Sequence, residues 1–235
     1  MNPIKSLKNL NAFEWGLWIF SLIIVGISGF AAPNQSPLML INSLIGVTAL
    51  IFVAKADVLG QILTVVFSLL YAVISYSFSY YGEMITYLCM TMPIAIMSVV
   101  SWIRHPFSKD SVEVKVNKIA KNEWLLMLLA SAAVTLAFYF ILRHFNTANL
   151  LFSTISITTS FMAAYLSFRR SPFYALAYSA NDIVLIILWV LASLKNSIYM
   201  PVAVCFTMFF INDVYGFINW NRIKKRQNSL SMEES

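Results

Sequence analysis

Eight long apolar runs follow one another along the 235-residue chain, separated by short polar segments. A helix needs about 17 to 25 mostly apolar residues to cross the hydrocarbon core of a bilayer, and each run has about that length. The pattern therefore predicts an all-helical integral membrane protein. Its spans are expected at residues 15–32, 38–54, 58–78, 84–103, 124–142, 150–168, 173–194 and 198–220.

Polar side chains recur at helical spacing along the third of these spans. Gln61, Thr64, Ser68, Tyr71 and Ser75 are three or four residues apart and so share one helix face. Such a stripe indicates the wall of a polar cavity. The alternative stays open for each hydroxyl, because Ser and Thr in membrane helices often bond their own backbone or a neighbouring helix.

Two Asn-Asp pairs interrupt the last two spans. Asn181 and Asp182 lie in the seventh, and Asn212 and Asp213 lie in the eighth, followed by Tyr215. An ionisable group inside a transmembrane helix costs about 2.5 to 3.5 kcal/mol on insertion scales, so it usually faces a bundle interior or a cavity. At a rise of ~1.5 Å per residue, both pairs are roughly 15 to 18 Å from the basic end of their spans. We therefore expect both pairs at the floor of a solute-binding cavity near the middle of the bilayer.

An internal repeat relates the second to fourth spans to the sixth to eighth. A shift of 118 residues aligns Trp102 with Trp220 and Tyr71 with Trp189, with a few residues of slack near the ends of the second and sixth spans. Four crossings separate equivalent spans, so the two triplets run in the same direction and the fifth span links them. Transporters with parallel repeats place their site at the repeat interface. The paired aromatic residues Tyr71 and Trp189 are then candidates to sandwich a planar ligand.

The composition agrees with a membrane protein, with 60% hydrophobic and 11% charged residues and mean hydropathy of +0.76. The net charge of +6 is a matter of topology rather than of nucleic-acid binding, because the Lys and Arg residues lie at span ends. With a cytoplasmic N-terminus, all of the 16 Lys and Arg residues except Arg143 and Lys195 fall on the inner side. Such a bias is the positive-inside signature, so both termini are expected in the cytoplasm.

The chain accordingly divides into five parts. Residues 1–37 form an N-terminal segment with an accessory span, and residues 38–103 form the first three-helix repeat. Residues 104–149 hold a cytoplasmic loop and the linker span, 150–220 the second repeat, and 221–235 a cytoplasmic tail. Pro93 in the fourth span follows Thr91 and frees a backbone carbonyl, which permits a hinge or a static kink.

Four segments resemble the PnuC family of bacterial vitamin transporters, which are typically nicotinamide riboside transporters. They read LYAVISYSFSYYGEM at 70–84, MTMPIAIMSVVSWIRHP at 90–106, ANDIVLIILWVLAS at 180–193 and FINDVYGFINW at 210–220. The resemblance covers nearly the whole chain. It implies a 3+1+3 core like that of the SWEET sugar transporters with an extra N-terminal helix, a homotrimer in the cytoplasmic membrane, and facilitated diffusion of a riboside that a cytoplasmic kinase then traps.

The resemblance also assigns roles within the site, on polar positions of the third, fourth, seventh and eighth spans. Asn181 and Asn212 would bond the carboxamide or the ribose hydroxyls, and Tyr71 and Trp189 would stack on the ring. The full expected set is Thr64, Ser68, Tyr71, Thr91, Asn181, Asp182, Trp189, Asn212, Asp213 and Tyr215. One departure is Ala95, which stands where some members have Gln, so thiamine or riboflavin are alternative solutes.

The expected mechanism is passive carriage by alternating access, without any cofactor. The chain has no nucleotide-binding loop of the form G-x-x-x-x-G-K-[ST], so it is not expected to hydrolyse ATP. Proton coupling through Asp182 is an alternative within the same class, and a membrane sensor or scaffold is an alternative of another class. An intramembrane enzyme is disfavoured, because His105 and His144 both lie outside the expected spans.

Overall fold

The computed structural model describes residues 3–31, 36–77, 81–108, 111–147 and 149–233. In these residues the regular structure is helical, apart from two isolated β-bridges in the segment after the fourth span. Eight helical stretches of the described chain are long and apolar enough to cross a membrane, which confirms the predicted number of spans. The helices are α1 (Pro3–Lys8), α2 (Ala12–Ala31), α3 (Pro37–Ala54), α4 (Val58–Ser77), α5 (Tyr81–Thr86), α6 (Met92–Arg104), α7 (Lys121–His144), α8 (Leu150–Phe168), α9 (Phe173–Lys195) and α10 (Met200–Glu233).

The observed helices match the apolar runs closely, with two differences. The fourth span consists of α5, a π-helical turn at Tyr87–Thr91, and α6. The eighth begins with a 3₁₀ turn at Ser197–Tyr199 and then continues as α10 to Glu233, past the expected end at Trp220. The expected ends of the first and third spans, Ala32 and Phe78, lie outside the described residues.

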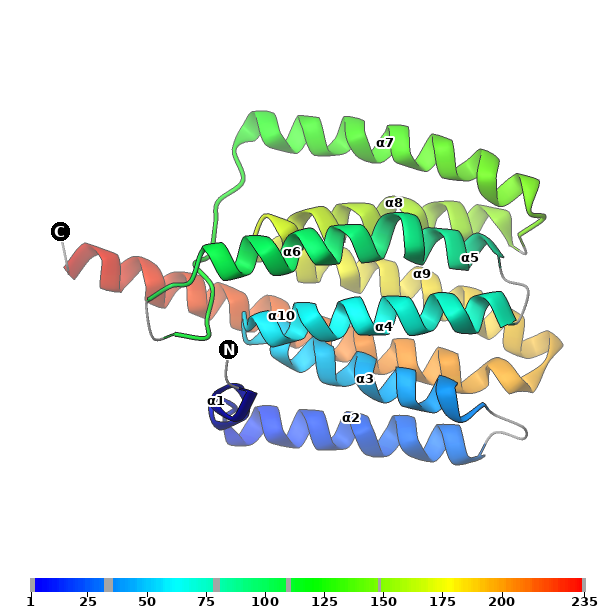
Figure 1. The fold of residues 1–235 in the computed structure, drawn as a ribbon, viewed down its shortest axis with the longest axis horizontal. Helices are drawn as coiled ribbons and strands as arrows, with labels where there is room; N and C mark the ends of the chain where they lie inside the picture. Colours follow the sequence, from blue (N-terminus) through cyan, green and yellow to red (C-terminus); the bar gives the residue numbers. More distant parts are fainter. Residues whose placement is uncertain (1–2, 32–35, 78–80, 109–110, 148, 234–235) are drawn as a thin grey trace.

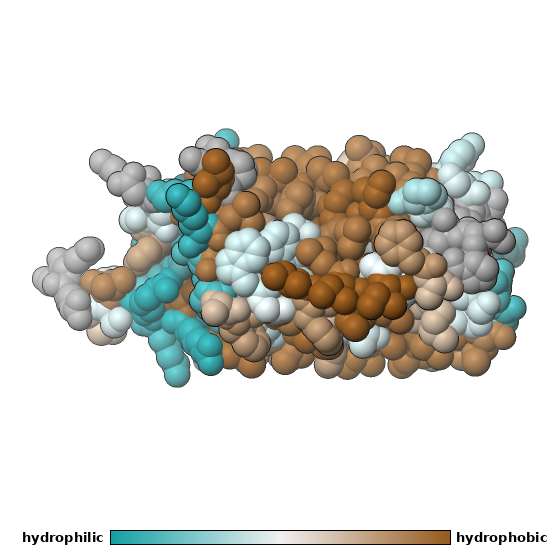
Figure 2. Space-filling view, turned by 90° about the horizontal axis from the view of Figure 1, so that it is seen from below, coloured by the Kyte–Doolittle hydropathy of each residue, from teal (hydrophilic) through white to brown (hydrophobic). Residues whose placement is uncertain are grey.

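The long helices lie side by side along one direction, with both marked termini at the same end of the bundle (Figure 1). Helix α7 stands at one side and packs mainly on α8, whereas α2 lies at the opposite side against α3 and α10. In the space-filling view a broad apolar band covers the length of the bundle, and hydrophilic residues gather beyond it, chiefly at the end that carries the termini (Figure 2). This distribution is typical of a multi-pass membrane protein.

The helix contacts are consistent with the two parallel triplets that the repeat predicts. Helix α4 packs between α3 and α6, and α9 packs in the same way between α8 and α10. Across the triplets α3 contacts α10, and α8 contacts α6. The turns after α3 and α8 have the same form, with left-handed backbones at Ala56 (φ 57°) and Arg170 (φ 56°).

Two tryptophans join the triplets by equivalent hydrogen bonds. The indole of Trp102 on α6 donates to the carbonyl of Ser167 on α8 at 2.9 Å, and that of Trp220 on α10 donates to the carbonyl of Val53 on α3 at 2.8 Å. Both side chains are fully buried, and their ring centroids are 5.5 Å apart. The predicted repeat partners therefore meet where the two triplets pack together, near the end that carries the termini.

The segment that follows α6 closes this end of the bundle. The backbone amide of Val114 donates to Ala56 in the α3–α4 turn at 2.9 Å, and the Glu113 carboxylate accepts from Arg226 and Gln227 on α10. The part of α10 that follows Trp220 is thus held at Arg226 and Gln227 by contacts with the segment after α6.

Candidate functional site

A cavity opens between the two triplets, in the half of the bundle nearer the termini. It is bounded by the later part of α3, the first half of α4, the π-helical turn, α8, α9 and α10. Centres of water molecules can occupy about 80 Å³ of it, and since one water needs roughly 10 to 15 Å³ on this measure, the cavity can hold several. Its described lining residues are Gly46, Ala49, Leu50, Val53, Gln61, Thr64, Phe67, Tyr87, Thr91, Ser160, Tyr174, Tyr178, Asn181, Asp182, Phe206, Phe209 and Asp213.

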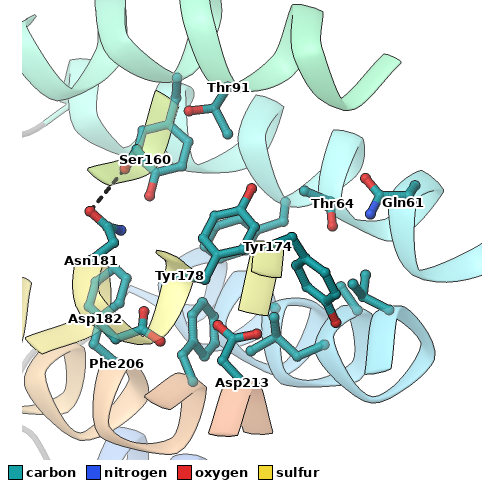
Figure 3. Close-up of a pocket in the computed structure, with 17 residues that line it drawn as sticks. Gln61, Thr64, Thr91, Ser160, Tyr174, Tyr178, Asn181, Asp182, Phe206 and Asp213 are labelled. Carbon is teal, nitrogen blue, oxygen red and sulfur yellow. Dashed lines mark hydrogen bonds between the residues drawn. The ribbon is translucent and has the colours of Figure 1, made fainter. Parts of the chain in front are cut away.

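Asn181 on α9 is held in one orientation by three hydroxyl donors from α8. Its Oδ1 accepts from Thr159 at 2.8 Å, from Ser160 at 3.0 Å and from Ser156 at 3.2 Å. Thr159 and Ser160 follow Ser156 by three and four residues, so the three hydroxyls lie on the same face of α8 and point toward Asn181. Because Oδ1 accepts from these hydroxyls, the Nδ2 group is the part of the amide that can donate to a solute in the cavity that Asn181 lines (Figure 3).

Asp182 and Asp213 bring two carboxyl groups together on the wall next to Asn181. Asp182 comes from α9 and Asp213 from α10, and the two carboxyls lie within hydrogen-bonding reach of each other (Figure 3). Asp182 is 2% exposed and Asp213 3% exposed. None of the described residues that line the cavity is Lys, Arg or His. The acidic pair therefore has no basic counter-charge on the described walls of its own cavity.

The π-helical turn shapes the opposite wall. The amide of Met92 donates to the carbonyl of Tyr87, five residues back, instead of to the residue four back. Pro93 follows at once, and its ring has no N–H and clashes with the carbonyl four residues earlier, so a regular α-turn is disfavoured here. Tyr87 at the start of the turn and Thr91 at its end both line the cavity.

A second, smaller cavity lies beyond the first, toward the other end of the bundle. It is bounded by the first part of α3, the second half of α4 and the start of α10. Phe67 and Phe206 line both cavities and so form the layer between them. Tyr71 and Trp189, the predicted ring sandwich, line this second cavity rather than the first. Tyr71 packs on Tyr87 with ring centroids 4.3 Å apart, and Trp189 packs on Tyr199.

Five of the residues expected in the site line the first cavity together. They are Thr64 on α4, Thr91 in the π-helical turn, Asn181 and Asp182 on α9, and Asp213 on α10. Thr64 and Asp182 are partners under the 118-residue shift, and they approach the cavity from opposite triplets. The two residues that the repeat alignment pairs therefore line the same cavity, one from each triplet.

Three expected residues lie outside both cavities. Ser68 is fully buried and donates to the carbonyl of Thr64 on its own helix, which is the packing role left open for the hydroxyl stripe. Asn212 donates to Ser21 on α2 at 3.0 Å, and Tyr215 donates to Glu14 on α2 at 2.6 Å. Successive helix residues point about 100° apart, so Asp213 faces the cavity while its neighbour Asn212 faces α2.

The expectation from sequence left out several residues that line the cavity. Gln61 was on the polar stripe, and its amide donates to Ser167 at 2.9 Å, which links α4 to α8. Tyr174 lies two helical turns and Tyr178 one turn before Asn181 and Asp182, a spacing that was visible in the chain. Ser160 belongs to a row of serines at helical spacing in the sixth span, Ser153, Ser156, Ser160 and Ser167, which was likewise visible in the chain. The phenylalanines carried no such signal, because apolar side chains are common throughout these spans.

The chemistry that this cavity offers is recognition rather than covalent catalysis. It combines amide and hydroxyl donors, two carboxyl acceptors and aromatic faces, a set that suits a small polar ligand with a planar ring. Among the described residues no cluster of three or more His, Cys, Asp or Glu side chains is placed to hold a metal ion.

Comparisons with known proteins agree on one family. The model of the family described as nicotinamide mononucleotide transporter matches residues 36–222. The chain is 26% identical over 216 residues to the nicotinamide riboside transporter PnuC of Neisseria mucosa, covering 90% of this chain and 82% of that protein. It is 21% identical over 213 residues to the PnuC of Haemophilus influenzae, covering 90% and 91%. A crystal structure of a vitamin B3 transporter PnuC superposes with a TM-score of 0.80 at 26% identity, covering 93% of this chain and 94% of that one.

Proposed function

Because the chain belongs to the nicotinamide mononucleotide transporter family, a family of membrane transporters, we propose that it carries nicotinamide riboside across the membrane by facilitated diffusion. The observation that carries the proposal is the cavity between the two triplets, where Asn181, Asp182 and Asp213 face aromatic side chains. The relatives from Neisseria mucosa and Haemophilus influenzae are both nicotinamide riboside transporters, which supports the same solute here.

The electrostatics of the cavity favour the riboside over the mononucleotide that gives the family its name. A phosphate group is bound in proteins chiefly by Arg, Lys and backbone amides at helix N-termini. The described lining residues include neither Lys nor Arg, and they do include two carboxyl groups. A phosphomonoester would therefore find no cationic partner on these walls, whereas a riboside brings only hydroxyls, a carboxamide and a pyridinium ring.

In the proposed complex each group of the riboside meets a complementary wall. The Asn181 Nδ2 group donates to the carboxamide or to a ribose hydroxyl, since Oδ1 is occupied by α8. Tyr87 and Tyr178 offer ring faces within the same cavity. Ala95 is buried and lies outside the cavity lining, so the carboxamide is bound by α9 rather than by the position that carries Gln in some members.

Rocking of the two triplets about their shared contact would expose the cavity to one side and then to the other. The layer of Phe67 and Phe206 separates it from the second cavity, so that layer would part when the far side opens. The proposal also includes cytoplasmic termini, supported by the distribution of Lys and Arg. It includes as well a homotrimer and trapping of the solute by a cytoplasmic kinase, which rest on the resemblance to the PnuC family alone.

Thiamine is the second candidate solute, because it is also an organic cation with aromatic rings. Riboflavin has an uncharged ring system and gains nothing from the acidic pair at Asp182 and Asp213. Both can be tested in the same assay as the riboside, with purified protein in liposomes.

The test measures uptake of radiolabelled nicotinamide riboside, nicotinamide mononucleotide and thiamine into these liposomes, without any ion gradient. We expect saturable uptake of the riboside that stops at equal concentrations, and uptake of the mononucleotide at the level of empty liposomes. Uptake of thiamine alone would reassign the solute, and uptake of none of the three would refute a carrier function. Accumulation that requires an imposed proton gradient would replace facilitated diffusion with coupled transport.

A further inference from the structure

The cavity holds an uncompensated pair of acidic side chains. Asp182 and Asp213 approach within hydrogen-bonding reach, and the described residues around them supply no Lys, Arg or His. Two carboxyls this close in a site of low dielectric do not both carry a negative charge unless a positive group lies beside them. The cavity therefore has a place for one positive charge, which a ligand can supply.

Two buried polar atoms beside this pair also lack partners. Asp182 Oδ2 and the Tyr174 hydroxyl form no hydrogen bond with the described residues, although both side chains line the cavity. Asp182 is 2% exposed and Tyr174 1% exposed, so bulk water does not compensate them. Buried polar atoms are normally satisfied, and an exception at a cavity wall indicates a missing ligand or water.

The rest of the wall suits an organic cation better than a metal ion. Phe67, Tyr87, Tyr178, Phe206 and Phe209 present aromatic side chains to the same space. A cation within about 6 Å of an aromatic face is stabilised by the ring quadrupole, and this is how proteins bind quaternary ammonium groups. Hard metal ions instead favour sites rich in carboxylate ligands, and among the described residues no group of three or more His, Cys, Asp or Glu side chains is placed to hold a metal ion.

We propose that Asp182 and Asp213, together with the aromatic wall, make this carrier selective for solutes whose ring carries a positive charge. The inference rests on the proposed function and adds a specificity determinant to it. In nicotinamide riboside the glycosylated ring nitrogen is quaternary, so the ring is a cation. The reduced dihydro form has the same ribose and carboxamide with an uncharged ring, which makes it a matched probe for the charge alone.

The experiment measures calorimetric binding of both forms to the wild type and to Asp182→Asn and Asp213→Asn. The wild type should bind the cationic riboside at least about 10-fold more tightly than the reduced form. Each variant should lose about 10- to 100-fold in affinity for the cation, since interactions with charged groups are the stronger ones, and less than about 3-fold for the neutral form. Glu123→Gln on α7, which removes a carboxyl bonded to Arg169 away from the cavity, should change neither affinity.

The outcomes separate this inference from the function on which it rests. Equal binding of both forms by the wild type would overturn the charge selectivity and leave the riboside carrier standing, and that comparison needs no variant to fold. Binding of neither form would overturn both. If replacing sodium by N-methylglucamine shifts the affinities for both forms equally, the acidic pair holds an inorganic cation and the proposal is wrong.

Discussion

At the scale of single residues, the two asparagines of the Asn-Asp pairs have different surroundings. Asn181 is fixed by three hydroxyl donors from α8 and faces the cavity, whereas Asn212 is 1% exposed and bonded to Ser21 and to the carbonyl of Met208. The first asparagine therefore contacts space that a solute can occupy, and the second holds α2 against α10.

The two positions can be told apart by the same substitution. Asn181→Leu removes a donor to the solute, so we expect riboside affinity to fall at least about 10-fold, with a small loss of thermal stability because Thr159 also bonds carbonyls of its own helix. Asn212→Leu should lower thermal stability and leave affinity within about 2-fold. Calorimetry and thermal unfolding in detergent measure both effects, and a loss of affinity only in Asn212→Leu would mean that the solute contacts the other face of α10.

The chain pattern predicted the depth of these pairs but not the direction of each side chain. Spacing along one helix shows that Asn212 and Tyr215 share a face, yet it does not show which neighbour that face meets. Helix α2 supplies the partners, since Glu14 is fully buried and pairs with Lys55 at 3.1 Å and with Tyr215. Glu14, Trp18 and Ser21 lie on one face of that helix, and this polar face was a visible signal that α2 packs on the core.

At the scale of elements, the fourth span shows how one proline changes a wall of the cavity. Pro93 sets the π-helical turn at Tyr87–Thr91, and the wider turn directs both end residues toward the solute space. From the sequence, Pro93 predicted either a hinge or a kink, and the bond of Met92 to Tyr87 shows the form that the irregularity takes. A π-turn adds a residue to one helical turn, which no periodicity in the sequence signals.

Replacing this proline tests whether the turn serves the site. Pro93→Ala restores an N–H that can bond the carbonyl of Cys89, so a regular α-helix becomes favourable through the segment. We expect equal or higher thermal stability together with riboside affinity lower by about 10-fold, because Tyr87 and Thr91 rotate away from the cavity. Pro201→Ala, in the first turn of α10 where a missing N–H costs little, is the matched control. Unchanged affinity in Pro93→Ala would make the turn a packing feature only.

The eighth span was expected to end at Trp220, because the apolar run stops there and basic residues follow from Arg222. The helix instead continues to Glu233, since residues 221–233 contain good helix formers and neither Gly nor Pro. The partner that orders its base, Glu113, lies over a hundred positions earlier in the chain. Contacts between residues this far apart in the chain cannot be predicted from local sequence patterns.

At the scale of the whole molecule, a pair of equivalent tryptophan contacts lies within the interface that α3 and α10, and α6 and α8, form between the two triplets. Trp102 donates to Ser167 in the other triplet, and Trp220 donates to Val53 in return. The repeat alignment had paired the two tryptophans, but only the folded chain shows that their rings touch and that each bonds the opposite triplet. Alternating access by rocking requires a contact that persists while the helices around it tilt, and this crossed pair is placed to be that contact.

Substitution of each tryptophan tests the symmetry of this contact. Trp102→Phe and Trp220→Phe keep most of the buried ring but remove one indole hydrogen bond each. The loss should cost about 0.5 to 1.5 kcal/mol, because the Ser167 and Val53 carbonyls still accept from the backbone amides of Arg170 and Ala56. We expect similar falls in thermal stability for the two variants, and a loss in the double variant that departs from the sum because the rings touch. Trp124→Phe on α7, which crosses no triplet boundary, should have little effect.

If the triplets rock about this contact, uptake of the riboside should fall in both variants while equilibrium affinity stays near the wild-type value, because the cavity does not include either tryptophan. Unequal effects on stability, with uptake unchanged, would show that the two contacts are not equivalent and that the pivot lies elsewhere.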